Sequence, residues 1–464
     1  MKEMRAPRLE ELAGARVLVL GLGRAGTAAA RFLLRRGAVV MACEDNSKIR
    51  NSLPIRRLRL MGLRLVRDAS SSGVDWAVVS PGISNGHPLV SVLSRRGVPL
   101  VDELDLSALF VGGPVVAVTG TNGKSTTTVL IARILQAAGK RAFFGGNLAP
   151  GRPLATALQM PRQDYYVVEA SSFQLERARW FRPTVAVILN VTPDHLNRHG
   201  TMVRYAESKF RILDRQTPAD FAVLNSDDPM LRPARKRGDA EKRFFSIRRQ
   251  VRGAWLDREQ EPGDGGWLMF DDERIMRASR LRLPGMHNVQ NALAAIAAVK
   301  LLGGGNRAIV SALASFAGLP HRLEFVRRLD GVDYINNSMC TNPAAGARSL
   351  ESVAGLRPKR GVVLIAGGRG KGLPMAEYVR SIARQAKWAV LMGETRDELG
   401  AELTVLRFRR WETADNLRAA VRAAKAHAGR GDAVLFSPGF ASFDQFADFT
   451  ARGTAFIHEV KRLQ

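Results

Sequence analysis

The chain has 464 residues, 46% of them apolar, which predicts roughly two to four domains, and its apolar runs are shorter than the about 18 residues that cross a bilayer. No apolar segment marks a signal peptide, and the two cysteines, Cys43 and Cys340, exclude a disulfide framework or a cysteine-based zinc site, so we expect a cytoplasmic protein without a membrane partner. The net charge of +27 is spread along the chain with one excess at 231–252, which favours a solvated basic face over a nucleic-acid site.

The first part of the chain alternates short apolar strands with helices, which predicts a parallel sheet. The segment "ARVLVLGLGRAGTAAARF" runs from a strand through Gly21, Gly23 and Gly26 into an alanine-rich helix, and Asp45 follows a second apolar run. This is the spacing of a dinucleotide fingerprint, in which glycines let the backbone approach a pyrophosphate and the acid binds a ribose hydroxyl. The same turn can hold any diphosphate, so an NAD-dependent oxidoreductase is one of several alternatives.

A phosphate-binding loop opens the second part, after a linker at residues 112–114. The segment "TGTNGKSTTT" (119–128) matches G-x-x-x-x-G-K-[ST] except that Val118 replaces the first glycine. Backbone amides at the start of the following helix can still point at phosphate oxygens, Lys124 adds a positive charge, and Ser125 offers a hydroxyl to Mg²⁺. The loop therefore predicts ATP and Mg²⁺ as cofactors.

Two further stretches of the second part carry side chains suited to chemistry. Glu169 ends the apolar strand of "YYVVEASSFQLE", where its carboxylate can reach Mg²⁺ or serve as a structural acid at the end of a strand. Another strand ends at Asn190, and the loop after it carries Asp194 and His195 before a helix that Thr201 is predicted to cap.

A lysine lies in the apolar stripe of that helix. Met202, Tyr205, Ala206, Lys209 and Leu213 fall on one helical face. Burial would favour the neutral amine of the lysine, which is nucleophilic and can form a carbamate with CO₂. The alternative is a lysine that extends from the edge of the stripe into solvent, and spacing alone favours this alternative.

The remaining segments predict one more buried helix and one more parallel sheet. The helix of "LPGMHNVQNALAAIAAVKLL" is apolar nearly all round and should be buried, with Asn288 and Asn291 at its start. Beyond residue 318, three apolar strands alternate with helices, and "GGRGKGLP" and "SPGFASFDQF" follow two of them. Ligands bind at the carboxyl ends of such strands, so both loops are candidate site segments.

The fold prediction is an α/β protein of three domains. We expect a Rossmann-like amino-terminal domain at 1–112, a central P-loop ATPase domain with a parallel sheet at 113–318, and a Rossmann-like carboxy-terminal α/β domain at 319–464.

Taken together, these motifs resemble the Mur ligases. The resemblance rests on "GTNGKST", "GGN" at 145–147, "EASSFQ" at 169–174, "NVTPDHLNRHG" at 190–200 and Lys209. The segments "LPGMHNVQNALAA", "GLPHRLE", "AGGRGKG" and "SPGFASFDQF" narrow it to the members that use D-glutamate. The phosphate loop of this family also lacks the first glycine.

The resemblance implies an ATP-dependent amide ligase of cytoplasmic peptidoglycan precursor synthesis that works through an acyl phosphate. Its expected substrates are UDP-N-acetylmuramoyl-L-alanine and D-glutamate, its cofactors ATP and Mg²⁺, and its expected state a monomer without nucleic-acid or membrane partners. The three domains would then bind the UDP-sugar, bind ATP, and bind the amino acid together with ATP, in chain order.

Motif matching also implies the residues of each site. The ATP-binding residues would be Gly120, Thr121, Asn122, Gly123, Lys124, Ser125, Thr126, Thr127, Asn288, Arg322 and Asn337. The UDP-sugar would contact Arg24, Ala25, Glu44, Asp45, Gly82 and Asn147. The amino acid would contact Thr341, Lys371, Ser442 and Phe449. The metal ligands would be Ser125, Glu169, His195 and a carbamylated Lys209, and the catalytic residues Lys124, His195 and Lys209.

The chain departs from the family pattern in two segments. The D-glutamate ligases usually read D-S-K-A-T-N where this chain has "NSMCTN" (337–342), so Asn337 replaces an acid and Met339 a lysine, and Asn197 replaces an aspartate in "DHLNR". Because Met339 removes a positive charge near the amino-acid pocket, the same ligase reaction with L-glutamate or a neutral amino acid remains an alternative.

Two further classes of enzyme explain part of the pattern. Folylpolyglutamate synthetases share "GTNGK" but typically continue with glycine where this chain has Ser125. A nucleic-acid-dependent ATPase would explain the charge and the loop, but not Lys209 or the third domain.

Overall fold

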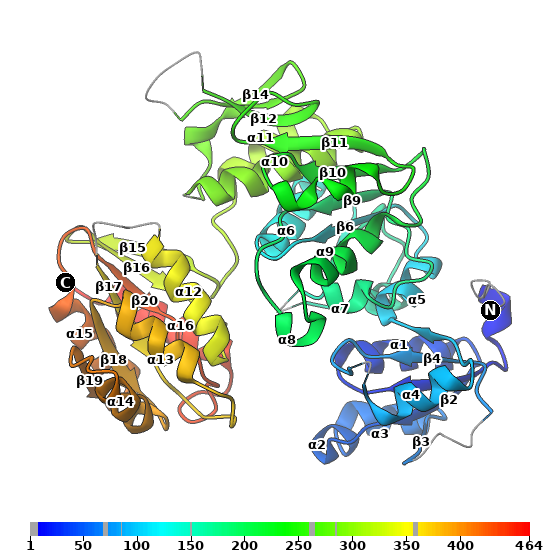
Figure 1. Cartoon of the computed structure of the whole chain (residues 1–464), viewed down its shortest axis with the longest axis horizontal. Helices are drawn as coiled ribbons and strands as arrows, with labels where there is room; N and C mark the ends of the chain where they lie inside the picture. Colours follow the sequence, from blue (N-terminus) through cyan, green and yellow to red (C-terminus); the bar gives the residue numbers. More distant parts are fainter. Residues whose placement is uncertain are drawn as a thin grey trace. The chain divides into compact units, whose positions relative to one another are not determined.

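The chain divides into two compact units, Met1–Phe316 and Ala317–Gln464. The first unit contains two sheets and the second contains one (Figure 1). The computed structural model describes residues 8–67, 73–84, 86–148, 151–258, 265–283, 285–355 and 361–464.

The amino-terminal sheet is parallel throughout, with strand order β3-β2-β1-β4-β5. Its strands are β1 (Arg16–Leu20), β2 (Val39–Cys43), β3 (Arg64–Leu65), β4 (Trp76–Val79) and β5 (Leu100–Val101). Its helices are α1 (Arg24–Arg35), α2 (Ser47–Arg50), α3 (Leu53–Leu60) and α4 (Pro88–Arg95). The strand order reverses between β1 and β4, where such sheets bind ligands. At this point α1 packs so closely on the turn after β1 that a Cβ on Gly26 would lie 1.9 Å from the Gly21 carbonyl oxygen.

The central sheet has nine strands in the order β14-β13-β12-β11-β10-β9-β6-β8-β7. They are β6 (Val115–Thr119), β7 (Ala142–Gly146), β8 (Tyr165–Glu169), β9 (Val185–Ile188), β10 (Phe221–Asn225), β11 (Glu241–Ser246), β12 (Gly253–Asp257), β13 (Trp267–Phe270) and β14 (Glu273–Arg277). The first seven are parallel, whereas β13 and β14 add an antiparallel hairpin that was not predicted. Its tight turn uses Asp271 in the left-handed region at φ 46°.

Helices cover both faces of the central sheet and enclose two hydrophobic clusters. The helices of this part are α5 (Glu103–Phe110), α6 (Lys124–Ala137), α7 (Ser172–Leu175), α8 (Leu196–His199), α9 (Met202–Phe210), α10 (Met286–Leu301) and α11 (Asn306–Ser315). One cluster contains apolar residues of α6, α10 and α11, and the other contains residues of α5, α7 and α9. Helix α10 is buried over most of its length, which confirms the prediction for the helix that begins near Asn288.

The second unit contains a six-stranded sheet with the order β15-β16-β20-β17-β18-β19. Its strands are β15 (Glu324–Leu329), β16 (Val332–Asn336), β17 (Val362–Ala366), β18 (Trp388–Met392), β19 (Trp411–Ala414) and β20 (Ala433–Phe436). Its helices are α12 (Pro343–Gly355), α13 (Ala376–Gln385), α14 (Arg396–Val405), α15 (Leu417–His427) and α16 (Phe449–Lys461). Only β15 is antiparallel, and a hydrophobic cluster lies on each face of the sheet.

The predicted fold class is confirmed, because the chain forms three α/β sheets in the expected order. The predicted boundaries after residues 112 and 318 stay a prediction, and they fall between elements: α5 ends at Phe110, and α11 ends at Ser315. Among the described residues, no helix is long and apolar enough to cross a membrane.

Candidate active site

The phosphate loop connects β6 to α6 through two glycines that adopt positive φ. Gly120 has φ 150° and Gly123 has φ 84°, and a Cβ on Gly123 would lie 2.2 Å from Oδ1 of Asn291 on α10. The Asn190 side chain after β9 brackets the loop, because its Oδ1 accepts from the Asn122 amide at 2.8 Å and its Nδ2 donates to the Asn122 carbonyl at 3.1 Å. Val118, where the usual pattern has glycine, is a buried residue of β6. The two glycines therefore shape the loop without a third.

The cation of the loop lies over the loop itself. Lys124 Nζ donates to the carbonyl oxygens of Gly120 at 2.9 Å and Thr121 at 2.8 Å. Its neighbour on α6, Ser125, donates its hydroxyl to a Glu169 carboxylate oxygen at 2.5 Å, and Asn147 Nδ2 donates to the other carboxylate oxygen at 3.2 Å. The carboxyl ends of β6, β7 and β8 thus bring a cation, a hydroxyl and a carboxylate to one edge of the sheet.

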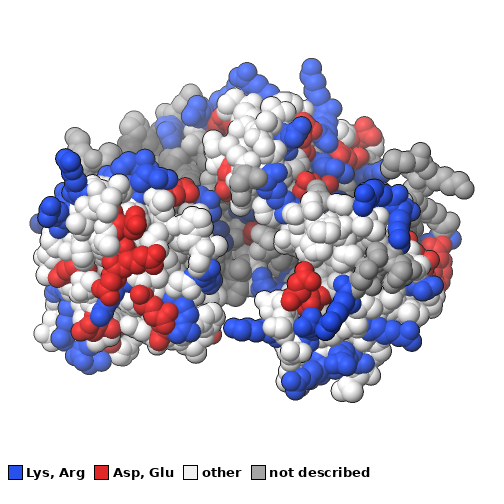
Figure 2. Space-filling model, turned by 60° about the horizontal axis from the view of Figure 1, so that its bottom comes forward, with Lys and Arg blue, Asp and Glu red and all other residues white. Residues whose placement is uncertain are grey.

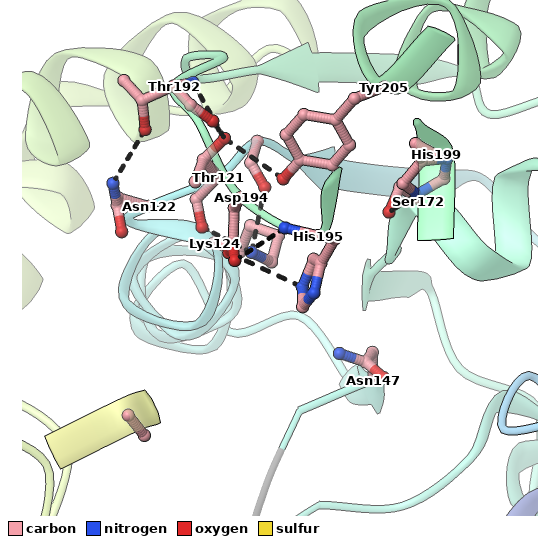
Figure 3. Close-up of polar contacts among 12 residues, drawn as sticks. Thr121, Asn122, Lys124, Asn147, Ser172, Thr192, Asp194, His195, His199 and Tyr205 are labelled. Carbon is pink, nitrogen blue, oxygen red and sulfur yellow. Dashed lines mark hydrogen bonds and ion pairs between the residues drawn. The ribbon is translucent and has the colours of Figure 1, made fainter. Parts of the chain in front are cut away.

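The loop after β9 adds an imidazole to this edge. His195 has a left-handed backbone at φ 53°, and its Nε2 lies 3.5 Å from a carboxylate oxygen of Asp194 (Figure 3). Its ring packs against Phe173 with centroids 4.9 Å apart. Thr201 caps α9 by accepting from the Arg204 amide, which confirms the predicted start of that helix.

Lys209 is buried, with 1% of its surface exposed, so the alternative of a lysine that extends into solvent is wrong. Its Nζ donates to the Gly120 carbonyl oxygen at 2.9 Å and lies 4.4 Å from the centre of the Tyr205 ring. Burial lowers the pKa of Lys209 well below its usual value, and the positive charge of Lys124 lowers it further. Both effects shift the equilibrium of Lys209 toward the neutral amine, at a position in contact with the phosphate loop.

A cavity of about 610 Å³ lies at the carboxyl ends of β1, β2 and β4, between the two sheets of the first unit. All six residues matched to the UDP-sugar line it: Arg24, Ala25, Glu44, Asp45, Gly82 and Asn147. The Glu44 carboxylate accepts from the amides of Leu22 at 2.6 Å and Asn46 at 2.9 Å, so it holds the turn after β1 as well. Asp45 is exposed at the rim, 3.7 Å from His87 Nε2.

A group of buried acids borders this cavity, and the sequence did not single them out. Asp102, Glu103 and Asp105 lie at the start of α5, and Glu103 lines the cavity. Burial raises the pKa of Glu103 to about 7 and that of Asp105 to about 6. Glu103 accepts from the Ala155 amide and from the Ser107 hydroxyl. The string "DELD" at a helix start is typical of an exposed first turn, so no local signal indicated burial.

Glu103→Gln should stabilise the first unit at pH 8. Because the pKa of Glu103 is raised in the folded state, the stability that this group contributes is complete below pH about 4.5 and lost as the pH rises through about 7. Glutamine keeps an oxygen acceptor for Ala155 and Ser107 without the buried charge. We expect the free energy of unfolding by urea to rise by about 2–3 kcal/mol at pH 8 and by little at pH 5.

The matched control is Glu10→Gln, which removes a carboxylate from an exposed position of the same unit. It should change the free energy of unfolding little at either pH. An equal gain from Glu103→Gln at both pH values would show that the charge of Glu103 is not the destabilising factor.

In the second unit, three of the residues matched to the amino acid lie on loops that follow β16, β17 and β20, and Phe449 begins α16. Thr341 and Lys371 line a cavity of about 70 Å³, in which Lys371 Nζ donates to the Thr341 carbonyl oxygen at 3.4 Å. Ser442 and Phe449 lie outside its lining. Buried Arg452 connects the loop that carries Thr341 to the loop that carries Ser442. Its guanidinium donates, at 3.0–3.1 Å, to the carbonyl oxygen of Ser338 on the first loop and to those of Phe440 and Ala441 on the second.

Arg452 was missed from the sequence because an arginine within a helix gives no sign of burial. It lies on α16, and burial lowers its pKa to about 10. Its hydrogen bonds to the loops that carry Thr341 and Ser442 indicate that it positions both of them.

The ATP-binding residues matched outside the phosphate loop fall in both units. Asn288 lies in the first turn of α10 in the first unit, and its Oδ1 accepts from Asn291 at 3.2 Å. Asn337 is buried in the second unit, where Nδ2 donates to Ser349 at 2.9 Å and to Ser437 at 3.0 Å. Arg322 lies between two residues with positive φ.

Within the described residues, no three His, Cys, Asp or Glu side chains form a group that could hold a metal by itself. The side chain of Asn197 lies outside the described part of the chain.

Comparisons with known proteins match this chain along its length. Residues 15–102 match the Mur ligase MurD-like N-terminal domain, 118–299 the Mur ligase middle domain and 321–440 the Mur ligase glutamate ligase domain. UDP-N-acetylmuramate-alanine ligase MurC from Thermotoga maritima has the same fold at 19% identity and a TM-score of 0.56, over 96% of this chain and 99% of that chain. The MurF ligase from the same organism, solved with ADP, aligns at 19% identity and a TM-score of 0.55, over 98% and 97%.

The chain belongs to the Mur ligase family, whose members are ATP-dependent ligases. It is 40% identical to the UDP-N-acetylmuramoylalanine–D-glutamate ligase of Pelotomaculum thermopropionicum, over 98% of this chain and 99% of that protein. It is 37% identical to the ligase of that name from Koribacter versatilis, over 98% of both chains. Within the family it groups with the D-glutamate ligases of peptidoglycan synthesis, as the motifs indicated. The interpretations as an NAD-dependent oxidoreductase or a nucleic-acid-dependent ATPase are therefore wrong.

Proposed function

We propose that the protein joins D-glutamate to UDP-N-acetylmuramoyl-L-alanine through an acyl phosphate, with the UDP-sugar in the 610 Å³ cavity and ATP on the phosphate loop. The observation that carries this assignment is a chain of contacts within the first unit. Asn147 lines the cavity and donates to Glu169, and Glu169 accepts the hydroxyl of Ser125 on the phosphate loop. A substrate bound in the cavity would thus have its reacting end beside the triphosphate.

The proposed chemistry converts a poor acyl donor into a good one. An oxygen of the substrate carboxylate attacks the γ-phosphorus of ATP, and ADP leaves. The amine nitrogen of the amino acid then attacks the acyl carbon, inorganic phosphate leaves with the former carboxylate oxygen, and the amine gives up a proton. Lys124, held at the loop by two carbonyl oxygens, stabilises the charge that spreads over the transferring phosphoryl group. Bringing three substrates together favours a mobile carboxy-terminal domain.

Mg²⁺ fits the donor set beside the loop. Ser125 and Glu169 offer hard oxygen donors, and Mg²⁺ in nucleotide sites typically takes one or two carboxylates together with phosphate oxygens and water. His195 and a carbamylated Lys209 are the further proposed ligands. When bound, the ion would neutralise the triphosphate and the developing charge.

The carbamate on Lys209 would resolve an electrostatic conflict. As an ammonium, Lys209 is a buried cation that is further destabilised by the charge of Lys124. In the proposed reaction the neutral amine attacks the carbon of CO₂, a nitrogen–carbon bond forms, and a proton leaves to solvent. The resulting anion would attract Lys124 and supply oxygen ligands for a divalent ion.

The second unit is proposed to hold the amino acid. The proposed contacts of the amino acid are Thr341, Lys371, Ser442 and Phe449. The proposed contacts of the nucleotide outside the phosphate loop are Arg322 and Asn337, together with Asn288 of the first unit. The Asn337 side-chain amide donates to both Ser349 and Ser437. Its effect on ATP would therefore act through the position of the loop after β16 more than through a direct hydrogen bond. The domain boundaries, the cytoplasmic location and the monomeric state stay predictions.

Phosphate release measured with an amino-acid panel tests the proposed function. ATP hydrolysis should require UDP-N-acetylmuramoyl-L-alanine and an amino acid together, with D-glutamate preferred over L-glutamate and neutral amino acids. DNA or RNA should not change the rate. Turnover that nucleic acid stimulates without the UDP-sugar would contradict the ligase assignment, and a preference for L-glutamate or a neutral amino acid would contradict D-glutamate alone.

Met339→Lys should lower the KM for D-glutamate by a few-fold at most, because the position is partly exposed and a restored charge would be screened. Lys371→Ala should raise the KM much more, since it removes the cation proposed to hold the side-chain carboxylate. Steady-state kinetics with varied D-glutamate measure both effects. If Lys371→Ala leaves the KM unchanged while Met339→Lys lowers it tenfold or more, Lys371 does not hold that carboxylate.

A further inference from the structure

The first unit carries a strongly basic surface that the ligase reaction does not use. Residues 24–67 contain eleven Lys and Arg and two Asp and Glu, so a third of the chain's net charge of +27 lies in under a tenth of its length. The two acids, Glu44 and Asp45, line the cavity, as does one of the eleven cations, Arg24, whereas the other ten cations lie outside its lining. Figure 2 turns the bottom of Figure 1 forward, the end at which α2 and α3 lie, and Lys and Arg gather along the lower right of that view.

Helix α3 carries two leucines on its solvent-exposed face, opposite the face that packs on the core. Ile55 and Leu58 are buried under the helix, whereas Leu53 is 60% exposed and Leu60 is 90% exposed. Residues seven apart differ by only about 20° around a helix, so the two leucines form one outward stripe. Because both leucines are exposed, their side chains bury little apolar surface within their own domain.

Arginines surround this stripe. We call the exposed set the α3 surface: Val39, Leu53, Leu60 and Met61 with Arg35, Arg36, Arg56, Arg57, Arg59 and Arg64. Arg56 and Arg57 lie three and four residues after Leu53 and so flank the stripe on both sides. Within the described residues, none of these arginines forms an ion pair with an acidic side chain.

We propose that the α3 surface docks reversibly on an anionic phospholipid bilayer. Arginines on lipid phosphates, with leucines entering the boundary between headgroups and acyl chains, are what an interfacial helix presents. A nucleic acid would use the same arginines but would gain from stacking on aromatic rings, and residues 33–67 contain no Phe, Tyr or Trp. The apolar stripe therefore favours lipid over nucleic acid and replaces the expectation of no membrane partner with a peripheral contact.

The position of the surface suits an enzyme that works while docked. Val39 begins β2, Arg64 begins β3, and Met61 follows the end of α3, so these residues lie at the amino-terminal edge of the sheet. The UDP-sugar cavity lies at the opposite edge, after β1, β2 and β4. Docking through this edge would place the bilayer on the side of the sheet opposite the cavity.

Vesicle co-sedimentation of the full chain tests the proposal. The protein should pellet with mixed phosphatidylglycerol–phosphatidylcholine vesicles but not with phosphatidylcholine alone, and added salt should weaken binding. Arg56→Glu with Arg57→Glu should abolish binding, and Leu53→Ser with Leu60→Ser should weaken it roughly tenfold. Ligase turnover and Tm should stay at the wild-type values, since all four side chains are exposed and outside the cavity.

The control for charge alone is Arg232→Glu with Arg248→Glu, the same change at exposed positions of the basic stretch 231–252. It should retain most vesicle binding. Equal loss in the control, or no loss in the leucine variant, would overturn the proposal in favour of diffuse charge. Binding to polyuridylate that Leu53→Ser with Leu60→Ser leaves intact, without vesicle binding by the wild type, would overturn it in favour of nucleic acid.

Insertion of the stripe is tested with an environment-sensitive fluorophore on Leu60→Cys, since the native Cys43 and Cys340 are buried. Its emission should shift to the blue with phosphatidylglycerol vesicles. The same label on Val405→Cys, at a position of the second unit that is 76% exposed, should not shift. An unshifted label at Leu60 would overturn the insertion that the proposal requires.

Discussion

Lys124→Ala is expected to lower turnover about a hundredfold to a thousandfold, the effect of removing one preorganised charge donor from a transition state. The Lys124 ammonium is held at the phosphate loop by the carbonyl oxygens of Gly120 and Thr121, so its charge lies where the γ-phosphoryl group is proposed to transfer. Phosphate release at saturating substrates measures kcat directly. Tm should change little, because the side chain is only half-buried at the start of α6.

The matched control for this variant is Lys140→Ala. Lys140 is exposed just beyond the other end of α6. Its substitution therefore removes one positive charge from the same segment without changing the phosphate loop. It should keep wild-type turnover. Should Lys124→Ala retain more than about a tenth of wild-type kcat, this lysine would not take part in phosphoryl transfer.

The features predicted correctly from the sequence are those encoded over short distances along the chain. The glycines of the phosphate loop and the cap at Thr201 depend on a few neighbouring residues, so their spacing was sufficient. The stripe of α9 placed Lys209 among apolar residues but could not decide between burial and an extended side chain. Burial of Lys209 depends on a distant segment, because its amine donates to the carbonyl oxygen of Gly120, which follows β6.

The features missed from the sequence are those that tertiary burial alone defines. Glu103 and Asp105 look like ordinary acids of a helix start, and Arg452 looks like an ordinary surface arginine. Their burial comes from packing against segments far away in the sequence, such as the Ala155 amide on Glu103 and the Ser338 carbonyl on Arg452. No local pattern carries this information.

Lys209→Met is expected to abolish detectable turnover and to stabilise the protein. Methionine fills a similar volume without a charge, so it removes both the proposed metal-binding carbamate and the cost of a buried amine. Because the pKa of Lys209 is lowered in the folded state, the stability that this group contributes is present above its ordinary pKa of about 10.5 and lost as the pH falls through the lowered value. In CO₂-free buffer, the gain from methionine in free energy of unfolding should be largest near neutral pH and should fade as the pH approaches about 10.

The matched variant is Lys209→Arg, which keeps a cation that cannot form a carbamate and should be inactive and less stable than the wild type. Carbon NMR with ¹³CO₂ should give a carbamate signal in the wild type that both variants lack. Stripping CO₂ from the wild type should lower turnover, and bicarbonate should restore it. A wild type that stays fully active without CO₂ and shows no carbamate would remove the carbamate from the mechanism. The buried amine would then act on the phosphate loop only through its bond to Gly120.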